Sequence, residues 1–528
     1  MISSTTMTPI PYIDRILDQW ERDEERDALV CGPVRFTRGQ ARRRVFQLGH
    51  ALRGRGLAPG DGVGLLLGNR AESALLVLAV HLIGCRAVML PPEPGPGELA
   101  ALIDQSGARL VIADPVHGQR AVLAAGRCAS APVLASLGSP EVPFAEEDVW
   151  AVAAQCPVRR PERAPVPGPD EAVTVYYTGG TLGRPKLAAH GRLPYDAVML
   201  AVEAGRAAAP EGGDRVMVAT LLTHTSGHVT MLFALLTGSP LVVLPEWDAG
   251  AAFTALRDER ITMTMVVPPM LYQLLDDPRC QRGALPALRQ IMLGAAPVAP
   301  HRLRQAVEVF GPVLSQGYGQ TECAGITALP AHELPDPGDL GSPLWRSCGR
   351  AQPGAELEIR GVDGGRLPPG EAGEVCVRSP MRMLGYWQDP ERTAEAVDAE
   401  GWLRTGDVGY LDADGYLYLV DRAKDVIVTG TDSGNLYTRV LEDFLHALPG
   451  VRHAAAVGVP DEAVGERVRV FLTGAGIDVD GLVDSVTAEL GARYAPQEVV
   501  LVPELPLTQV GKVDKKALRA GAESASPA

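Results

Sequence analysis

A strand-like run that ends in a glycine- and threonine-rich loop constrains the fold of this chain more than any other segment. Residues 172–177 read Ala-Val-Thr-Val-Tyr-Tyr, and the loop after them closes on Lys186. Glycines let a backbone approach a polyphosphate, and consecutive N–H groups form an anion-binding nest. The spacing is not that of a Walker motif. The segment can therefore be interpreted either as a phosphate-binding loop or as an ordinary exposed loop. The candidate phosphate contacts are Thr178, Gly179, Gly180, Thr181, Gly183 and Lys186.

Strand-like and helix-like segments alternate through the first third of the chain. Residues 63–67, 87–90 and 109–113 are short apolar runs, whereas 71–83 has the apolar spacing of a helix. This alternation predicts an α/β fold with largely parallel sheets. A small β subdomain is predicted from the strand-like segments 356–360, 373–378 and 416–420. A compact C-terminal α+β unit is predicted from the segments 454–458, 467–473 and 481–490.

Four more motifs follow the loop in a fixed order. They are Gly-Tyr-Gly-Gln-Thr-Glu at 317–322, Thr-Gly-Asp at 405–407, Asp-Arg-Ala-Lys-Asp at 421–425 and Leu-Thr-Gln-Val-Gly-Lys at 507–512. In this order the set resembles the adenylate-forming superfamily, which comprises acyl-CoA synthetases, adenylation domains of peptide synthetases and luciferases. The resemblance covers nearly the whole chain. It implies a large N-terminal AMP-binding domain, placed here at 1–422, and a small mobile C-terminal domain at 423–528.

Activation of a carboxylic acid by ATP joins two anions, so the site needs a metal, a lysine and fixed dipoles. The resemblance implies that Glu322 holds Mg²⁺ against the ATP phosphates and that Thr321 bonds the α-phosphate. It also implies that Lys512 reaches over from the C-terminal domain to the α-phosphate and carboxylate. There its ammonium would offset charge that develops in the transition state. Lys424 falls at the position of the hinge residue between the domains.

The remaining nucleotide contacts also follow from the resemblance. The segment of small residues Gly294, Ala295, Ala296 and Pro297 would flank the adenine, and Tyr318 and Gly319 belong to the same nucleotide site. Asp407 would accept from the ribose hydroxyls, since charge-assisted bonds are stronger than neutral ones, and Arg422 would add a second contact.

A histidine-rich segment at 222–228 is expected at the mouth of the acid pocket. In the family an aromatic or imidazole ring gates this pocket, which implies that role for His224, whereas His228 is assigned a weaker one. The two would share a face if the segment is helical. Amino-acid-activating relatives carry an Asp where this chain has Thr225, so an α-amino acid is disfavoured as substrate.

Composition excludes several other classes of protein. A formal net charge of −15 over 528 residues argues against a broad nucleic-acid surface. The eight cysteines are scattered without a C-x-x-C pair, which favours neutral thiols in a reducing compartment. Neither a secretion signal nor an apolar stretch of membrane-spanning length is apparent. We therefore expect a cytoplasmic enzyme that uses a small-molecule acid, without a nucleic-acid partner.

The acceptor of the activated acid is less certain than its activation. The loop after Lys424 is two residues longer than usual between Gly430 and Asn435, and Val440 stands where a Glu is common. In CoA ligases this loop lines the pantetheine tunnel, so CoA is the favoured acceptor but a carrier-protein thiol stays open. A remoter alternative is nitrite activation for an aryl amine, as in ATP-dependent diazotases. A degenerate binding protein is disfavoured because Lys186, Glu322, Asp407 and Lys512 are all present.

Overall fold

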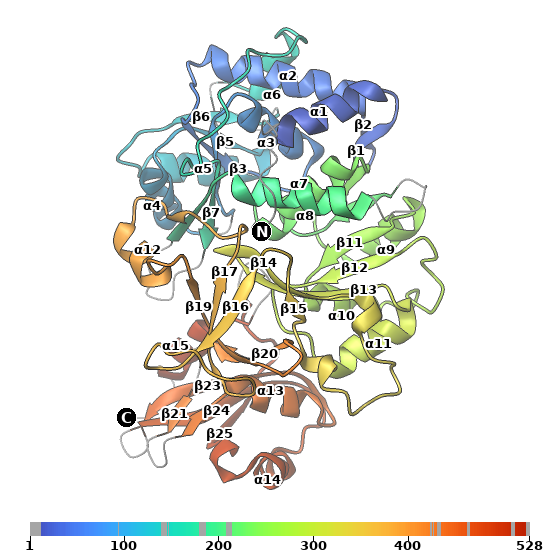
Figure 1. Cartoon of the computed structure of the whole chain (residues 1–528), viewed down its shortest axis with the longest axis vertical. Helices are drawn as coiled ribbons and strands as arrows, with labels where there is room; N and C mark the ends of the chain where they lie inside the picture. The colour runs from blue at the N-terminus through green and yellow to red at the C-terminus, as the bar shows by residue number, and fades with distance from the viewer. Residues whose placement is uncertain are drawn as a thin grey trace.

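The chain was examined as a computed structural model, which describes residues 12–92, 94–138, 145, 147–178, 186–206, 214–422, 425, 427–429, 434–461, 465–507 and 513–523. Figure 1 shows the N-terminal helices at one end of the molecule, the main sheets in the middle and the C-terminal elements at the other end.

A seven-stranded sheet carries the loop that was predicted to bind phosphate. Its strands, in order across the sheet, are β18 (Gly385–Tyr386), β8 (Lys186–His190), β7 (Thr174–Thr178), β4 (Arg86–Met89), β3 (Gly62–Leu66), β5 (Ala108–Ala113) and β6 (Val133–Ser136). Strands β7, β4, β3, β5 and β6 run parallel, whereas β8 is antiparallel to β7. The loop therefore joins two adjacent antiparallel strands at the carboxyl end of β7.

A nine-stranded sheet is the second main layer. Its strands, in order, are β15 (Arg350–Ala351), β14 (Cys323–Leu329), β13 (Leu314–Gln320), β12 (Gln290–Leu293), β11 (Met263–Val266), β9 (Val216–Val218), β10 (Leu241–Val243), β1 (Asp27–Cys31) and β2 (Val34–Thr37). The strands from β1 to β13 in this order are parallel. Their carboxyl ends meet at one edge, which is where open α/β sheets bind ligands.

Helices fill the space between these two sheets and cover their outer faces. Residues of α1 (Tyr12–Arg22), α2 (Arg38–Gly54), α3 (Ala71–Leu82) and α8 (Thr225–Thr237) share one buried apolar cluster with strands of both sheets. The α2 helix starts at a capping box in which Thr37 and Gln40 each satisfy a backbone N–H of the other. The other helices of the two layers are α4 (Pro96–Ser106), α5 (Gly118–Ala125), α6 (Val149–Ala154), α7 (Leu193–Arg206), α9 (Ala249–Asp258), α10 (Pro268–Asp276) and α11 (Pro300–Phe310).

Two smaller sheets complete the fold. The four-stranded sheet consists of β16 (Glu356–Arg360), β17 (Gly373–Arg378), β19 (Leu403–Leu411) and β20 (Leu417–Arg422). In the sequence, α12 (Pro390–Ala396) lies between β17 and β19. The five-stranded sheet consists of β22 (Gly434–Leu436), β21 (Ile427–Thr429), β24 (Gly465–Gly474), β23 (Val451–Asp461) and β25 (Glu498–Leu501). It packs with α13 (Thr438–His446), α14 (Val479–Leu490) and α15 (Lys515–Glu523).

The predicted fold class is confirmed: a large N-terminal region of α/β sheets with a β subdomain precedes a smaller C-terminal α+β unit. The boundary between residues 422 and 423 stays a prediction, although β20 ends at Arg422 and the next described strand begins at Ile427. All eight cysteines lie in the described residues and are free. None of the helices described is long and apolar enough to cross a membrane.

Candidate active site

Glu322 lies at the tip of the hairpin between β13 and β14, where the nine-stranded sheet reaches the seven-stranded sheet. Its Oε1 atom accepts a hydrogen bond from the Tyr386 hydroxyl at 2.8 Å and one from Thr178 Oγ1 at 3.4 Å. Both hydrogen bonds to its carboxylate in the described structure thus use one oxygen and come from neutral groups. Thr178 ends β7 and Tyr386 ends β18, so the contact joins the two sheets.

Lys186 is part of the same cluster. Its Nζ atom lies 3.4 Å from the Tyr386 hydroxyl and 4.5 Å from the centroid of that ring. Burial, followed by the neighbouring Glu322 carboxylate, raises the pKa of Tyr386 well above its ordinary value. The phenol therefore stays protonated and donates to Glu322 while its ring faces the lysine ammonium. We refer to Thr178, Lys186, Glu322 and Tyr386 as the phosphate-side cluster.

Hydrogen bonds from neighbouring segments to main-chain carbonyls hold the hairpin that carries Glu322. His190 Nε2 donates to the Thr321 carbonyl at 2.8 Å, and the Met383 N–H donates to the Glu322 carbonyl at 2.8 Å. A Cβ atom on Gly319 would lie only 2.4 Å from the Ala324 carbonyl oxygen, so this position of the hairpin requires glycine. The main chain of Thr321 is thereby held by the seven-stranded sheet rather than by its own strand.

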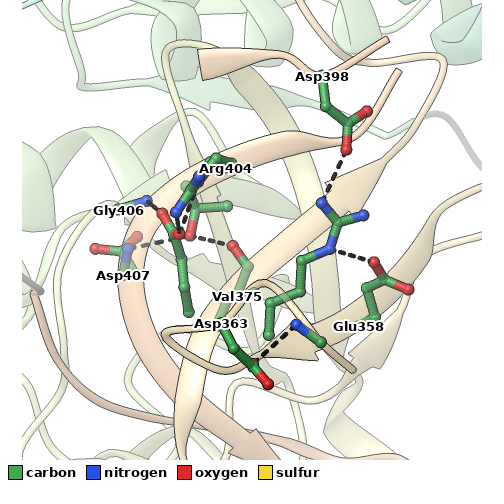
Figure 2. Close-up of polar contacts among 11 residues, drawn as sticks. Glu358, Asp363, Val375, Asp398, Arg404, Gly406 and Asp407 are labelled. Atoms are coloured by element: carbon green, nitrogen blue, oxygen red, sulfur yellow. Dashed lines mark hydrogen bonds and ion pairs between the residues drawn. The ribbon is translucent and has the colours of Figure 1, made fainter. Parts of the chain in front are cut away.

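Asp407 forms a second polar group with Tyr318. The Tyr318 hydroxyl donates to Asp407 Oδ2 at 2.6 Å, and burial together with this carboxylate raises the pKa of Tyr318 well above its ordinary value. Thr405 accepts from the Asp407 N–H at 3.1 Å and donates to the Val375 carbonyl at 2.7 Å. Figure 2 shows Asp407 beside Gly406 and Arg404, apart from the ion pairs that Arg360 makes with Glu358 and Asp398.

The segment predicted to flank the adenine lies directly after β12. Because β12 pairs in parallel with β13, with Leu293 opposite Gln316, this segment lies beside the strand that carries Tyr318. A Cβ atom on Gly294 would lie 3.5 Å from the Gly317 carbonyl oxygen. Ala295 has a φ of 68°, a left-handed conformation that costs a residue with a side chain about 1–3 kcal/mol. Ala296 and Pro297 follow on the partly exposed side of this turn.

His224 is the N-cap residue of α8 and is half-buried. The loop before it is pinned by Asn69, whose side chain donates to the Thr220 and Leu244 carbonyls and accepts from the Leu222 N–H. His228 lies inside the helix and its N–H bonds the His224 carbonyl at 2.9 Å. The segment is helical from Thr225, so His228 lies one turn after His224, which caps the helix and is not part of it.

Several predicted residues lie outside the described residues: Gly179, Gly180, Thr181, Gly183, the hinge Lys424 and the catalytic Lys512. For Arg422 only the backbone is described, and it pairs with Asp407 across β19 and β20. In the C-terminal unit Lys515 Nζ lies 2.8 Å from Glu442 Oε1. Burial acts to lower the pKa of Lys515, but Glu442 and Asp421 raise it above its ordinary value.

Sequence reasoning missed two residues that shape this site: Tyr386 and His190. Tyr386 could have been noticed from the aromatic pair that follows a glycine at 385–387, because an aromatic pair is unfavourable in a solvated turn. His190 gave no comparable signal, since its partner is a main-chain atom more than 100 residues away.

The structure brings together a glutamate at a hairpin tip, the threonine that ends β7 and the lysine that begins β8, and it buries an aspartate beside a tyrosine of β13. The model of the AMP-binding enzyme family matches residues 16–387, and that of the AMP-binding enzyme C-terminal domain matches 440–512. The chain belongs to this family. It is an ATP-dependent, AMP-forming ligase of the acyl-CoA synthetase type, which activates a carboxylic acid as the acyl-adenylate and releases pyrophosphate.

Individual relatives span nearly the whole chain. The medium/long-chain-fatty-acid–CoA ligase FadD8 of Mycobacterium tuberculosis is 33% identical over 95% of this chain and 88% of its own length. A feruloyl-CoA synthase of an Amycolatopsis species is 34% identical over 93% of this chain and 95% of its own. The solved structure of the amide bond synthetase McbA from Marinactinospora thermotolerans is 36% identical, covers 97% of this chain and 99% of its own, and has a TM-score of 0.85.

Proposed function

We propose that the phosphate-side cluster holds the triphosphate of ATP while Asp407 holds the ribose and the 294–297 turn flanks the adenine. The observation that carries this proposal is the meeting of Thr178, Lys186 and Glu322 around one tyrosine, from two different sheets. A hydroxyl, an ammonium and a carboxylate that can hold a metal are the groups that phosphate chemistry requires.

The residues present fit a magnesium ion. Mg²⁺ is bound in such sites by one or two carboxylates together with substrate phosphates rather than by a cage of protein ligands. In agreement with this, no group of three or more histidine, cysteine, aspartate or glutamate side chains in the described residues is placed to hold a metal. Glu322 would hold the ion, which when bound neutralises phosphate charge. Its Oε1 is oriented by Tyr386 and Thr178, which leaves Oε2 for the metal.

In the reaction a carboxylate oxygen of the acid attacks the α-phosphorus, and pyrophosphate leaves. Lys186 and Thr178 lie where they would steady the phosphates, and Lys512 would bring a second ammonium from the C-terminal unit in the first half-reaction. The net charge of −15 makes these local cations necessary, since the overall field of the protein repels both substrates.

For the second half-reaction we propose CoA as the acceptor, with the C-terminal unit turning about Lys424 between the two steps. FadD8 and the feruloyl-CoA synthase are both CoA ligases by name, and each is about one third identical to this chain. The acid is a small-molecule acyl or aryl acid. A carrier-protein thiol would attack the same adenylate carbonyl and is the alternative thiol acceptor.

An amine is the second candidate acceptor. The observation that favours it is the 36% identity to an amide bond synthetase over almost the full length of both chains. An amine attacks the acyl-adenylate to give an amide and AMP, so the first half-reaction is unchanged. The longer loop between Gly430 and Asn435, of which residues 430–433 lie outside the described residues, would then belong to a different acceptor site.

Product analysis separates these acceptors. The purified protein is incubated with ATP, Mg²⁺ and a panel of acids, first alone and then with CoA, with a phosphopantetheinylated carrier protein or with a panel of amines. Mass spectrometry identifies the thioester or amide. We expect a CoA thioester with each acid that supports pyrophosphate release. An amide without a thioester would replace CoA by an amine as acceptor, and formation of neither with any acceptor would refute both proposals.

A further inference from the structure

A small cavity lies beside α8, lined in part by Thr225, Val229 and Leu232 of that helix. Its volume is about 20 Å³, the room of one small group, so a substrate can enter only by displacing side chains of the wall. The wall combines aromatic rings with apolar side chains and one threonine. Its residues are Tyr176, His190, Pro194, Tyr195, Val198, Thr225, Val229, Leu232, Ala324 and Met381.

Two of the three buried histidines near this wall are fully engaged with the protein. His81 contacts the Tyr12 hydroxyl through Nδ1 and lies 3.1 Å from Thr174 Oγ1 through Nε2. His190 donates from Nε2 to the Thr321 carbonyl at 2.8 Å. Burial lowers the pKa of both rings to about 4, so both are neutral and serve as hydrogen-bonding parts of the core.

His228 differs from them. Its side chain is 0% exposed, and neither ring nitrogen has a hydrogen-bond partner in the described structure. It packs against two rings of the cavity wall, with centroid distances of 5.8 Å to Tyr176 and 5.9 Å to Tyr195. Along α8 it follows Thr225 by three residues and directly precedes Val229, and both of these line the cavity.

An unpartnered buried imidazole calls for a physical reason. Burial of a polar group without a hydrogen bond is unfavourable in proteins, and such groups are rare in native structures. Burial also lowers the pKa of His228 well below its ordinary value. The neutral ring offers one N–H donor and one nitrogen acceptor. A phenylalanine would place an aromatic ring here without that penalty, so the presence of both nitrogens points to a partner that arrives with the substrate.

We propose that His228 is a specificity-determining residue, which hydrogen-bonds a hydroxyl or N–H group on the ring of an aromatic carboxylic acid. This inference rests on the proposed acid-activating function of the same site. We expect the aromatic ring of the acid to pack against Tyr176 and Tyr195, because aromatic rings favour contact with the faces and edges of other aromatic rings. Its polar substituent then reaches the imidazole behind these two rings. An aliphatic chain would leave His228 without a partner.

The experiment measures acid-dependent pyrophosphate release for pairs of acids that differ by one polar group. The pairs are 4-hydroxycinnamate with cinnamate, 4-hydroxybenzoate with benzoate, and indole-3-acetate with 1-naphthaleneacetate, and octanoate represents aliphatic acids. For the preferred ring we expect kcat/KM to be at least about tenfold higher with the polar group than without it, since a site built to bond a hydroxyl rejects the analogue that lacks it.

Substitution of His228 then assigns this preference to the imidazole. His228→Phe keeps a ring and removes both nitrogens, so the ratio within the preferred pair should fall to about one, whereas His228→Asn should retain part of it. Met231→Leu, at a buried α8 position that does not line the cavity, is the control and should leave the ratio unchanged. Because His228 has no bond to lose, the melting temperature of His228→Phe should equal or exceed that of the wild type.

The outcomes separate this inference from the proposed function. If none of the acids supports pyrophosphate release, the proposed function is overturned. Release that is strongest with octanoate, or a polar-group ratio that is the same in wild type and His228→Phe, would overturn the role of His228 while leaving acid activation intact.

Discussion

The nucleotide side and the acid side of this site differ in how their polar groups are held. On the nucleotide side, Glu322 and Asp407 each accept from a tyrosine, so their carboxylates are oriented before any substrate binds. On the acid side the wall is neutral, and among the described residues His228 lies buried without a hydrogen-bond partner. We infer from this difference that the charged side binds ATP in the same way with every acid, whereas a few neutral side chains on the other side select the acid.

This comparison predicts that substitutions on the two sides fail in different ways. Changes among the charged groups should lower turnover with every acid alike, because they act on the ATP phosphates. Changes on the acid side should alter the ranking of acids more than the maximal rate. A charged-side variant that re-ranks the acids would break the distinction.

The largest effect is expected for Lys512→Ala. Loss of the ammonium that offsets charge at the α-phosphorus should lower acid-dependent pyrophosphate release by at least about 10³-fold, or about 4.1 kcal/mol of barrier. Transfer from a synthetic acyl-adenylate to CoA should be largely retained, which a rapid-quench assay of that half-reaction measures. An equal loss in both half-reactions would contradict the role of Lys512 in adenylation alone.

Glu322→Gln should have the next largest effect. The change keeps the shape and the contacts to Tyr386 and Thr178 but removes the charge that Mg²⁺ requires. We expect turnover to fall by at least about 10²-fold, which is about 2.7 kcal/mol of barrier, for every acid tested. The measurement is a magnesium titration of pyrophosphate release. Glu308→Gln, at an exposed position of α11, is the matched control and should behave as wild type; an unchanged magnesium dependence in Glu322→Gln would refute the assignment.

A smaller effect is expected for Asp407→Asn. A neutral amide makes weaker bonds to ribose hydroxyls than a carboxylate does, so KM for ATP should rise about tenfold, or about 1.4 kcal/mol, with little change in kcat. Asp398→Asn is the control, because Asp398 pairs with Arg360 in the same region (Figure 2) and should leave KM for ATP unchanged. Equal effects of the two substitutions would mean that Asp407 supports the sheet and not the nucleotide.

The sequence predicted the sheets of this enzyme well, because buried parallel strands have a strong local signal. The apolar runs at 63–67, 87–90 and 109–113 became β3, β4 and β5 to within one residue at each end. The motifs also identified Glu322, Lys186 and Asp407 as site candidates. Tyr386 was missed because its importance comes from a tertiary contact with Glu322, 64 residues away, which no local pattern encodes.

The acid side shows the limit of such reasoning more clearly. The sequence assigns His228 only a weaker role than His224 in the acid pocket. What distinguishes it from His81 and His190 is the lack of a partner for its nitrogens, and that property depends on side chains from β7, α3 and α7. The identity of the acid is hidden in the sequence for the same reason.

The stability of the fold against pH is predicted from three buried histidines, His81, His190 and His228. His81 and His190 have a pKa of about 4 in the folded chain and about 6.5 when unfolded, and His228 is shifted in the same direction. The unfolded chain therefore binds more protons between these values, and the free energy of unfolding falls as pH drops from about 6.5 to 4. Each histidine contributes up to about 1.4 kcal/mol per pH unit. Urea titrations across this range should show a shallower decline for His228→Phe; an identical decline would contradict a buried neutral imidazole.

The measurement that tests the central claim most directly is acid-dependent exchange of labelled pyrophosphate into ATP. Exchange requires reversible formation of an acyl-adenylate, and it needs neither CoA nor an amine. The account predicts exchange with at least one carboxylic acid, AMP rather than ADP as the nucleotide product once an acceptor is added, and loss of exchange in Glu322→Gln. Release of ADP and phosphate, or full exchange in Glu322→Gln, would contradict it.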